Sequence, residues 1–350
     1  MSKPQLGLTV NGTTITNALL SADIENNNFF AADTFEAEIA LNAMPAAFNA
    51  AFWSNSQAQI GISVGVGSGL TQLILGNADD VDIEIPAGLL RVRGRDLSAP
   101  LMDNKTTEKF QNQTSSQIVT QIAQMPQFNL TPNVAATTAP SGVFYEIDHA
   151  RLTDNISYWT LLNELARFEG FDVYVSGSTL NFQPSVPAGQ PSYTINYTPP
   201  TPQMIQSGNF IDLKMHKSQT LAKDVVVQVT SWNSKQRTAF TAASPPGAKA
   251  STNGNSTFYP MVRAGLTMDQ AQQLAQNMRQ EIALHERVVE VNMPGELALR
   301  PRQHVALTGT GTSFDQTYYI DRINRRVDVD GGFSESIRMK NQSPQNTADA

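Results

Sequence analysis

The chain has 350 residues, of which 40% are hydrophobic and 16% are charged, and its formal net charge at pH 7 is −7. This length predicts two or three domains. The negative balance argues against a protein that grips nucleic acid, which needs clustered lysine and arginine, and the lack of cysteine excludes disulfides and thiolate metal sites. We also expect no secretory signal peptide and no membrane span, since the sequence has neither a basic start before an apolar core nor a run of about 18 apolar residues.

Residues 5 to 95 have the pattern of several short strands. Apolar residues alternate from Leu6 to Val10, and Asn11-Gly12 is a favoured two-residue hairpin turn. Between residues 34 and 41, Phe35, Ala37, Ile39 and Leu41 alternate with Glu36, Glu38 and Ala40, which predicts a half-buried strand with one wet face. A short helix is expected within residues 45 to 52. Regularly spaced short strands predict a barrel or a sandwich.

Residues 96 to 205 predict a different kind of structure. Ser115 is a candidate cap for a short helix that ends before Pro126, and residues 129 to 142 have the composition of an exposed loop. From Arg151 to Ser185 we expect one packed unit of a helix and a hairpin. Residues 186 to 205 contain five prolines and predict an extended linker.

The unit from Arg151 to Ser185 is the best defined in the sequence. Thr153 or Asp154 is the expected helix cap, because a side-chain oxygen can accept a free amide of the first turn. Apolar residues then recur at helical spacing up to Phe168, and Gly170 is the expected stop. After it the period changes to two, which predicts a hairpin across Ser176-Gly177-Ser178.

A second β region follows the linker. Val225, Val227 and Val229 alternate with Val226, Gln228 and Thr230, and residues 244 to 256 predict a flexible surface loop. Thr267 and Gln270 have the spacing of a capping box at the start of a helix. Further strands are expected at residues 289–293, 305–307, 318–320 and 333–339, with Gly331-Gly332 as a hairpin turn and a frayed tail after Lys340.

No catalytic, cofactor-binding or metal-ligating residue is assigned. The four histidines, His149, His216, His285 and His304, form no pair with metal-ligand spacing. The acidic run from Asp79 to Glu84 could attract calcium, but a solvated strand edge is the favoured interpretation. The glycines from Gly65 to Gly69 precede a strand rather than a helix, so we expect a hairpin loop and not a nucleotide loop.

Two further groups of residues have a structural interpretation. Arg322, Arg325 and Arg326 lie near Asp321 and Asp328, which favours salt bridges on a strand pair over nucleic-acid contact. The three tryptophans are expected to be core or interface anchors, and they are Trp53, Trp159 and Trp232. A pair of carboxylates that cuts glycans is not excluded by sequence, because carboxylate separation is a spatial quantity.

Several segments, in order over most of the chain, resemble phage tail hub proteins of the late-control D-type family and the N-terminal half of type VI secretion spike proteins. The resemblance begins at PQLGLTVNGTTIT and includes Gly94, Arg95 and Asp96, then Asp103, Lys109, Phe110 and the helix at Ser115. It continues through LARFEGFDVYV and TLNFQP, and then VVEVNMPGELALRPRQHVALTG and TYYIDRINRRVDVDGGFSESIRMK. One departure is Arg302, where the family often has glycine in a Pro-Gly turn.

This resemblance implies a mainly β fold with α+β insertions, in which two tube-like β-barrel domains are joined by a helical and hairpin connector. The expected domains are a first tube-like barrel at 1–96, a connector at 97–205, a second tube-like barrel with a helix at 206–342 and a flexible tail at 343–350. The implied role is non-enzymatic. A trimeric baseplate hub of a contractile phage tail or injection system would adapt a sixfold tail tube to a threefold spike.

The partners implied are a homotrimer, the tail tube protein, the central spike protein, other baseplate or wedge proteins and the tape measure protein, with no specific nucleic-acid binding. The expected location is the tail of a virion made in the host cytoplasm. No cofactor is expected. Two alternatives stay open at this point: a hub-associated peptidoglycan hydrolase, and a carbohydrate-binding protein for host attachment.

Overall fold

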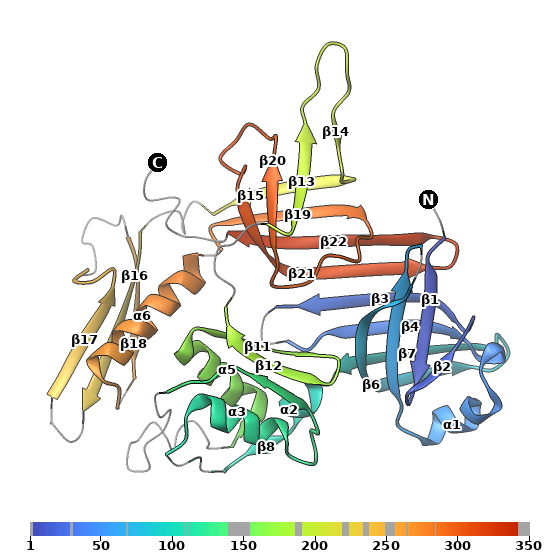
Figure 1. Ribbon diagram of the computed structural model, residues 1–350, viewed down its shortest axis with the longest axis horizontal. Helices are drawn as coiled ribbons and strands as arrows, with labels where there is room; N and C mark the ends of the chain where they lie inside the picture. The colour runs from blue at the N-terminus through green and yellow to red at the C-terminus, as the bar shows by residue number, and fades with distance from the viewer. Residues whose placement is uncertain are drawn as a thin grey trace.

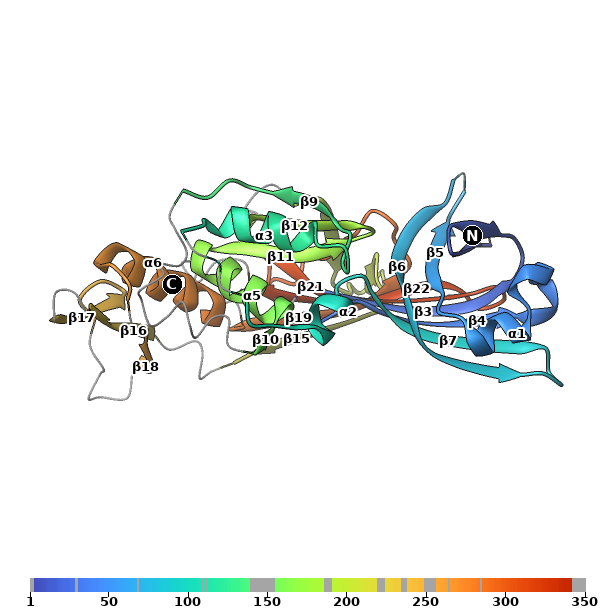
Figure 2. The same cartoon turned by 90° about the horizontal axis from the view of Figure 1, so that it is seen from below.

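The computed structural model describes residues 3–28, 31–67, 69–108, 110, 112–138, 155–185, 191–218, 224–233, 238–248, 256–263, 265–283 and 285–341. It confirms the predicted fold class, because the chain is mainly β with a few helices inserted (Figures 1 and 2). Within these ranges no helix is long and apolar enough to cross a membrane.

The first β region consists of seven strands and one short helix. Its strands are β1 (Gln5–Val10), β2 (Thr13–Ile15), β3 (Leu19–Asn27), β4 (Thr34–Ala40), β5 (Gln59–Gly65), β6 (Thr71–Glu84) and β7 (Leu89–Asp96). They are hydrogen-bonded in the order β3-β4-β7-β6-β5-β1-β2. The helix expected within 45–52 is a 3-10 turn at Ala46–Phe48 followed by α1 (Ala50–Asn55), and another 3-10 turn spans Leu41–Ala43.

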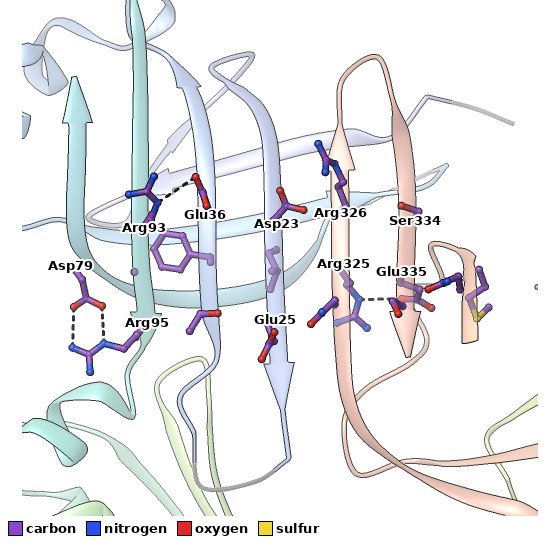
Figure 3. Close-up of a pocket in the computed structure, with 18 of the residues that line it drawn as sticks. Asp23, Glu25, Glu36, Asp79, Arg93, Arg95, Arg325, Arg326, Ser334 and Glu335 are labelled. Atoms are coloured by element: carbon purple, nitrogen blue, oxygen red, sulfur yellow. Dashed lines mark hydrogen bonds and ion pairs between the residues drawn. The ribbon is translucent and has the colours of Figure 1, made fainter. Parts of the chain in front are cut away.

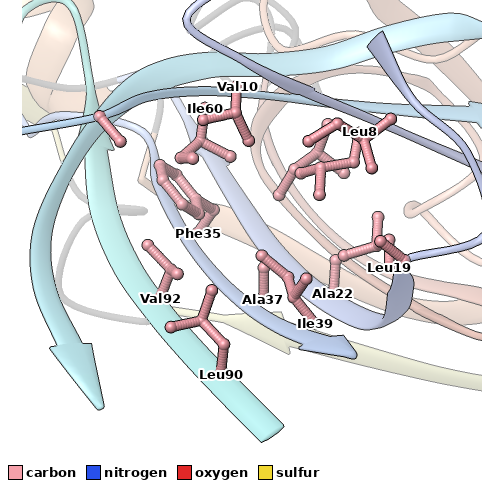
Figure 4. Close-up of a cluster of buried hydrophobic side chains, with 14 of the residues drawn as sticks. Leu8, Val10, Leu19, Ala22, Phe35, Ala37, Ile39, Ile60, Leu90 and Val92 are labelled. Atoms are coloured by element: carbon pink, nitrogen blue, oxygen red, sulfur yellow. The ribbon is translucent and has the colours of Figure 1, made fainter. Parts of the chain in front are cut away.

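Alternation of apolar residues makes this region fold around its own core. Strands β1 and β5 lie over β3, β4 and β7, so that Leu8 and Ile60 pack against Phe35, Ala37 and Val92 (Figure 4). Leu8, Ile60, Ala37 and Val92 are fully buried. Burying a leucine, isoleucine, valine or phenylalanine side chain contributes roughly 1.5–3 kcal/mol, which is why the alternation fixes the register of these strands.

The second β region continues the same sheet. Its strands are β13 (Tyr193–Thr198), β14 (Ser207–Gly208), β15 (Asp212–Lys217), β19 (Arg287–Pro294), β20 (His304–Thr308), β21 (Thr317–Asp328) and β22 (Gly332–Asn341). Strand β21 pairs antiparallel with β3 of the first region, from Arg322 opposite Asn27 to Asp328 opposite Ser21. A second core lies beneath β19, β20, β21 and β22.

The connector forms a third core between the two β regions. Its elements are α2 (Ala99–Asp103), β8 (Lys105–Thr106), α3 (Ser115–Ala123), β9 (Thr131–Val134), β10 (Ile156–Ser157), α5 (Tyr158–Glu169), β11 (Phe171–Ser176) and β12 (Thr179–Pro184). The helix and hairpin predicted after Arg151 are α5, β11 and β12. Trp159 and Phe182 are buried in this core.

The caps of the connector helices differ by a few residues from the predictions. Ser157 caps α5, since its side chain accepts the amide of Thr160, while the predicted Thr153 and Asp154 lie outside the described residues. Thr114 rather than Ser115 caps α3, through a capping box with Gln117. The neighbouring serines and threonines offer equivalent oxygens, so sequence alone does not select among them.

A fourth core belongs to a small module inserted between β15 and β19. It consists of β16 (Asp224–Asn233), β17 (Thr238–Ser244), β18 (Ser256–Val262) and α6 (Met268–Ala283), and its helix covers one face of a separate three-stranded sheet. The predicted capping box is confirmed, because Thr267 and Gln270 bond each other's amides. Arg263 ties the module to α5 through Glu164 at 2.6 Å.

Two segments predicted as irregular contain strands. The expected linker at 186–205 includes β13, which pairs with β20 from Tyr193 opposite Val305 to Asn196 opposite Thr308. The expected loop at 129–142 includes β9, which pairs with β12. Both are short strands whose partners are far away in the sequence. Local composition therefore does not predict them. Residues 139–142, 249–255 and the tail after residue 341 lie outside the described residues.

Gly170 is expected to be the least replaceable residue of the α5 cap. It ends α5 with φ +72, and a Cβ there would lie 3.0 Å from Asn277 Nδ2. Gly170→Ala should lower the free energy of unfolding by about 1–2 kcal/mol or more, because a left-handed alanine is strained and also crowds α6. Urea denaturation measures the effect. Gly247→Ala is the control, since Gly247 has φ +76 but open space around it; an equal cost at both positions would contradict the contact with Asn277.

Candidate functional site

One face of the continuous sheet is charged across the junction of the two β regions. In β4 the predicted Phe35, Ala37 and Ile39 are buried and alternate with Glu36 and Glu38. The same alternation holds in the neighbouring strands. The charged side chains of this face, here named the charged face, are Asp79, Asp82 and Glu84 of β6, Arg91, Arg93 and Arg95 of β7, Glu36 and Glu38 of β4, Asp23 and Glu25 of β3, and Arg322 and Arg326 of β21.

The three arginines of β7 each bridge carboxylates of neighbouring elements. Arg91 lies 2.9 Å from Glu38 and 2.8 Å from Glu84. Arg93 lies 3.3 Å from Glu36 and 3.4 Å from Asp82, and Arg95 lies 2.7 Å from Asp79 and 2.8 Å from Asp103. Hydrogen bonds to Arg95 hold the pKa of Asp103 below its usual range. The charges of this face are therefore largely compensated within the chain.

The charged face is hollowed into a groove at the junction (Figure 3). Its volume is about 690 Å³, and its lining comes from strands of both β regions, including β7, β4, β3, β21, β22 and β19. The register places Arg93, Glu36, Asp23, Arg326 and Ser334 in one row across five strands. Among its lining residues, Arg93 pairs with Glu36 and Arg95 pairs with Asp79, so these charged groups already have partners within the chain.

The acidic run from Asp79 to Glu84 lies on the distal half of β6, as the strand-edge interpretation predicted. Strand β5 pairs with β6 only from Thr71 to Asn77, and the part from Asp80 to Glu84 pairs with β7 alone. Three of its carboxylates, those of Asp79, Asp82 and Glu84, each pair with a different arginine of β7 rather than converging on one point. Among the described residues no group of three or more histidine or acidic side chains could hold a metal ion.

The other candidate motifs lie apart from this groove. Gly65 to Gly69 connect β5 to β6, which confirms a hairpin loop. His216 lies on β15, His285 precedes β19 and His304 begins β20 with its ring 5.5 Å from that of Tyr319, while His149 is outside the described residues. Burial lowers the pKa of both His285 and His304. Of the tryptophans, Trp53 and Trp159 are core residues and Trp232 is 47% exposed.

Two of the three arginines considered in β21, Arg322 and Arg325, form salt bridges on strand pairs as predicted, but with partners other than Asp321 and Asp328. Arg322 lies 3.7 Å from Glu25 on the charged face. Arg325 points to the opposite, buried face, where its Nε lies 3.3 Å from Glu335 and its side chain donates to Asn26 and to the carbonyl of Leu299. Asp321 pairs instead with Lys340 at 2.7 Å.

The buried pair of Arg325 and Glu335 was missed by the sequence analysis, although a signal existed. Arg325 occupies the inward position between Ile323 and Val327, and Glu335 occupies the matching position before Ile337. Both side chains are almost fully buried. Desolvation raises the pKa of Glu335 to about 7 despite the opposing charge of Arg325.

Arg325→Leu is expected to lower the free energy of unfolding by about 3–5 kcal/mol, because it leaves Glu335 buried without its partner. The double variant Arg325→Leu/Glu335→Leu should recover much of this loss. Arg322→Leu is the matched control on the same strand, and loss of its exposed pair should cost less than about 1 kcal/mol. Urea denaturation compares the three, and similar costs for both single variants would contradict the special position of Arg325.

A second buried cluster lies where the first β region meets the connector and β19–β20. Asp33 accepts hydrogen bonds from the amide of Asn27 at 2.7 Å and from the side chain of Asn26 at 2.8 Å. Asp96 accepts the amide of Ser98 at 3.1 Å. Burial raises the pKa of both carboxyls, and with the charge of Asp33 nearby the pKa of Asp96 rises to about 7.

Arg302 joins the parts of the chain that meet at this cluster. It has φ +70, the left-handed conformation that suits the glycine expected there from the family pattern. Its guanidinium donates to the carbonyl of Asn27 and lies 3.6 Å from the ring centre of Tyr174 in β11. The side chain that glycine lacks therefore contacts the first β region and the connector at once.

The raised pKa of Asp96 predicts a pH-dependent stability. The folded chain holds the proton up to about pH 7, whereas the unfolded chain releases it near pH 4, so stability falls as pH rises between these values, by at most about 1.4 kcal/mol per pH unit. Asp96→Asn has no carboxyl at this position and is free of this loss. The free energy of unfolding of the variant minus that of the unaltered chain should therefore rise with pH. Denaturation curves from pH 5 to 8 measure the difference.

Asp103→Asn is the control for this pH dependence. The pKa of Asp103 is lowered in the fold, so its contribution is complete above the unfolded pKa. The deficit of this variant should be constant from pH 5 to 8. Parallel curves for Asp96→Asn and the unaltered chain would show that Asp96 is not held protonated.

Comparison with known proteins gives matches at the level of structure. No protein-family model matches the sequence, and neither does any curated protein sequence. The chain is similar to the tail protein from Neisseria meningitidis MC58, with 13% identity, a TM-score of 0.71 and 97% of each chain covered. It is also similar to the 43 kDa tail protein of prophage MuSo2 from Shewanella oneidensis, with 16% identity, a TM-score of 0.66, and 96% and 98% covered.

A type VI secretion component also matches. It is the E. coli c3393 protein, described as structurally similar to the T4 tail proteins gp27 and gp5, with 12% identity, a TM-score of 0.52, and 95% of this chain and 76% of that chain covered. The chain therefore has the fold of phage tail proteins that is also found in contractile injection systems. The resemblance predicted from the sequence is confirmed at the level of the fold.

Proposed function

We propose that this chain is a non-enzymatic structural protein of a contractile phage tail or a tail-like particle, and that it acts as a homotrimeric hub. The observation that carries the proposal is the sheet that runs through both β regions. Eight of its strands are consecutive, in the order β6-β7-β4-β3-β21-β22-β19-β15, and each neighbouring pair is antiparallel. The first four strands belong to one β region and the last four to the other.

Both ends of this eight-strand series are open in a single chain. Within the described residues, β15 pairs only with β19, and the distal half of β6 pairs only with β7. Open edges readily pair with another chain. Because the number of strands is even and the directions alternate, β15 of one copy would meet β6 of the next as an antiparallel neighbour. Three copies would then close a ring of about twenty-four strands from six four-strand units.

This ring explains how one chain could match two symmetries. Six similar units would face a sixfold tail tube, while three identical chains would face a threefold spike. The charged face would line the channel, because the opposite face of the sheet is covered by the hydrophobic cores. Compensated ion pairs and a net charge of −7 suit a channel that DNA or proteins cross without binding.

The proposal includes the domain division and the partners expected from the sequence. Residues 1–96 and 206–342 would supply the two tube-like domains, and residues 97–205 the connector. Tail tube protein and central spike protein would bind at the two ends of the ring, with wedge, other baseplate and tape measure proteins as further partners. The chain would be located in the baseplate of the particle.

Native mass spectrometry of the purified chain, alone and with its tube and spike proteins, tests the proposal together with negative-stain images. We expect a mass near three chains and a ring with a central opening. A monomer that persists with both partner proteins present would overturn the hub role. Loss of turbidity from cell walls, or binding in a glycan screen, would instead support a hydrolase or a host-attachment protein.

Met215→Glu is expected to prevent ring closure. Met215 lies on the inward side of the open strand β15, opposite the buried Val289, and is 41% exposed in the single chain. A charge there stays exposed in a monomer. In the ring it would be buried at the seam, the place where β15 of one copy pairs with β6 of the next, and inward charges on edge strands block such pairing. Lys214→Glu, on the other side of the same strand and opposite Glu290, is the control and should still form trimers. Trimers of both variants would contradict a seam at β15.

A further inference from the structure

A protruding hairpin in the second β region is both exposed and apolar at its tip. Strands β13 and β14 form its base, and every residue from Thr198 to Asn209 is exposed. Met204 is 62% exposed and Ile205 is 87% exposed. Removing large apolar side chains from water is favourable, so this tip has a strong tendency to be covered.

The hairpin is nevertheless held in one conformation at its tip and at its base. At the tip, Thr201 and Met204 exchange backbone hydrogen bonds of 2.8 and 3.2 Å. At the base, the side chain of Asn209 donates to the carbonyl of Thr194 and accepts the amide of Asn196. A pre-ordered arm loses little conformational entropy when it binds, which favours a role in recognition over that of a passive loop.

The direction of the hairpin indicates where its partner lies. In Figure 1 it extends past β15, the last strand of the eight-strand series, and it points across the strands rather than along them. In a closed ring, the direction across the strands leads to the neighbouring copy, whereas the direction along the strands leads towards stacked partners. Exposed Ile211 and Met215 continue the apolar surface from the hairpin to this edge.

The opposite end of the sheet has matching apolar residues. Val66 and Leu70, in the loop between β5 and β6, are 50% and 51% exposed, and Ile85 beyond the end of β6 is 70% exposed. Val66 and Leu70 precede β6 and Ile85 follows it, so they lie at opposite ends of the strand that would face β15 of the next copy. The largest exposed apolar side chains of the two β regions thus lie at complementary edges.

We propose that the hairpin of residues 198–209 is a clamp that binds the first β region of the neighbouring copy of this chain, with Met204 and Ile205 as its anchors. The inference rests on the proposed trimer and adds to it a specific element that fixes one copy to the next. The clamp would lie outside the strand seam, so that each contact between copies has two separate parts.

A photo-crosslinking experiment on the assembled trimer tests the clamp. The chain has no cysteine, so Ile205→Cys provides one unique site for a thiol-linked benzophenone. We expect crosslinks between copies, located by mass spectrometry within residues 1–96. Gln273→Cys, exposed on α6 of the small module, is the control and should give no crosslinks within residues 1–96 of another copy. Crosslinks of residue 205 that stay within its own chain, or that form only when tube or spike protein is added, would overturn the clamp.

The strength of the trimer provides a second test. Ile205→Asp should weaken the association of copies about tenfold or more, as expected for loss of one buried apolar anchor. Gln203→Asp adds the same charge to the same tip without removing an apolar side chain and should change the association little. Melting curves confirm that both exposed variants fold. If both variants form trimers as strong as those of the unaltered chain, the clamp is wrong and the hub proposal stands; if the unaltered chain forms no trimer, the hub proposal itself fails.

Discussion

The pairing of β3 with β21 is the contact on which the rest of the structure depends. It joins strands that are about 300 residues apart in sequence into one sheet, and its register runs over seven residue pairs from Asn27–Arg322 to Ser21–Asp328. Val327 of β21 packs in the core of the first β region, so the pairing is supported by burial as well as by hydrogen bonds. Without it the chain would have two separate β regions and no common charged face.

Buried charges fix the register of this junction. Arg325 and Glu335 are paired on the inner face, directly below the strands that join the two β regions. A buried ion pair adds little net stability compared with apolar residues, but it penalises any arrangement in which one partner lacks the other. Arg325 also donates to the side chain of Asn26 in β3, and a slip of one residue between β3 and β21 would break this hydrogen bond, so the buried arginine favours one alignment of the two halves.

The two faces of the sheet have separate roles because side chains alternate along a strand. The buried face supplies the cores that hold each β region together. The charged face has rows of arginines and carboxylates whose charges are compensated. The open edges at β6 and β15, and the hairpin beyond β15, are what remain for contacts with other chains. The buried cores, the charged face and the open edges thus use different atoms of the same strands, which allows each to change with little effect on the others.

The sequence by itself determined the local features of this protein. Alternation placed Phe35 and Ile39 inside and Glu36 outside, Gly170 ended the helix of the connector, and the order of family-like segments indicated the tail-protein fold. The alternation and the helix stop depend on neighbours a few residues apart, so local physics decides them, whereas the order of segments is a resemblance to known proteins. Only the tertiary structure decided that β13 is a strand, that α6 belongs to a separate module, and that Arg325, Glu335, Asp33 and Asp96 meet at a junction. Such features depend on partners far apart in the chain, and their pairing is fixed by burial and register when the whole sheet forms.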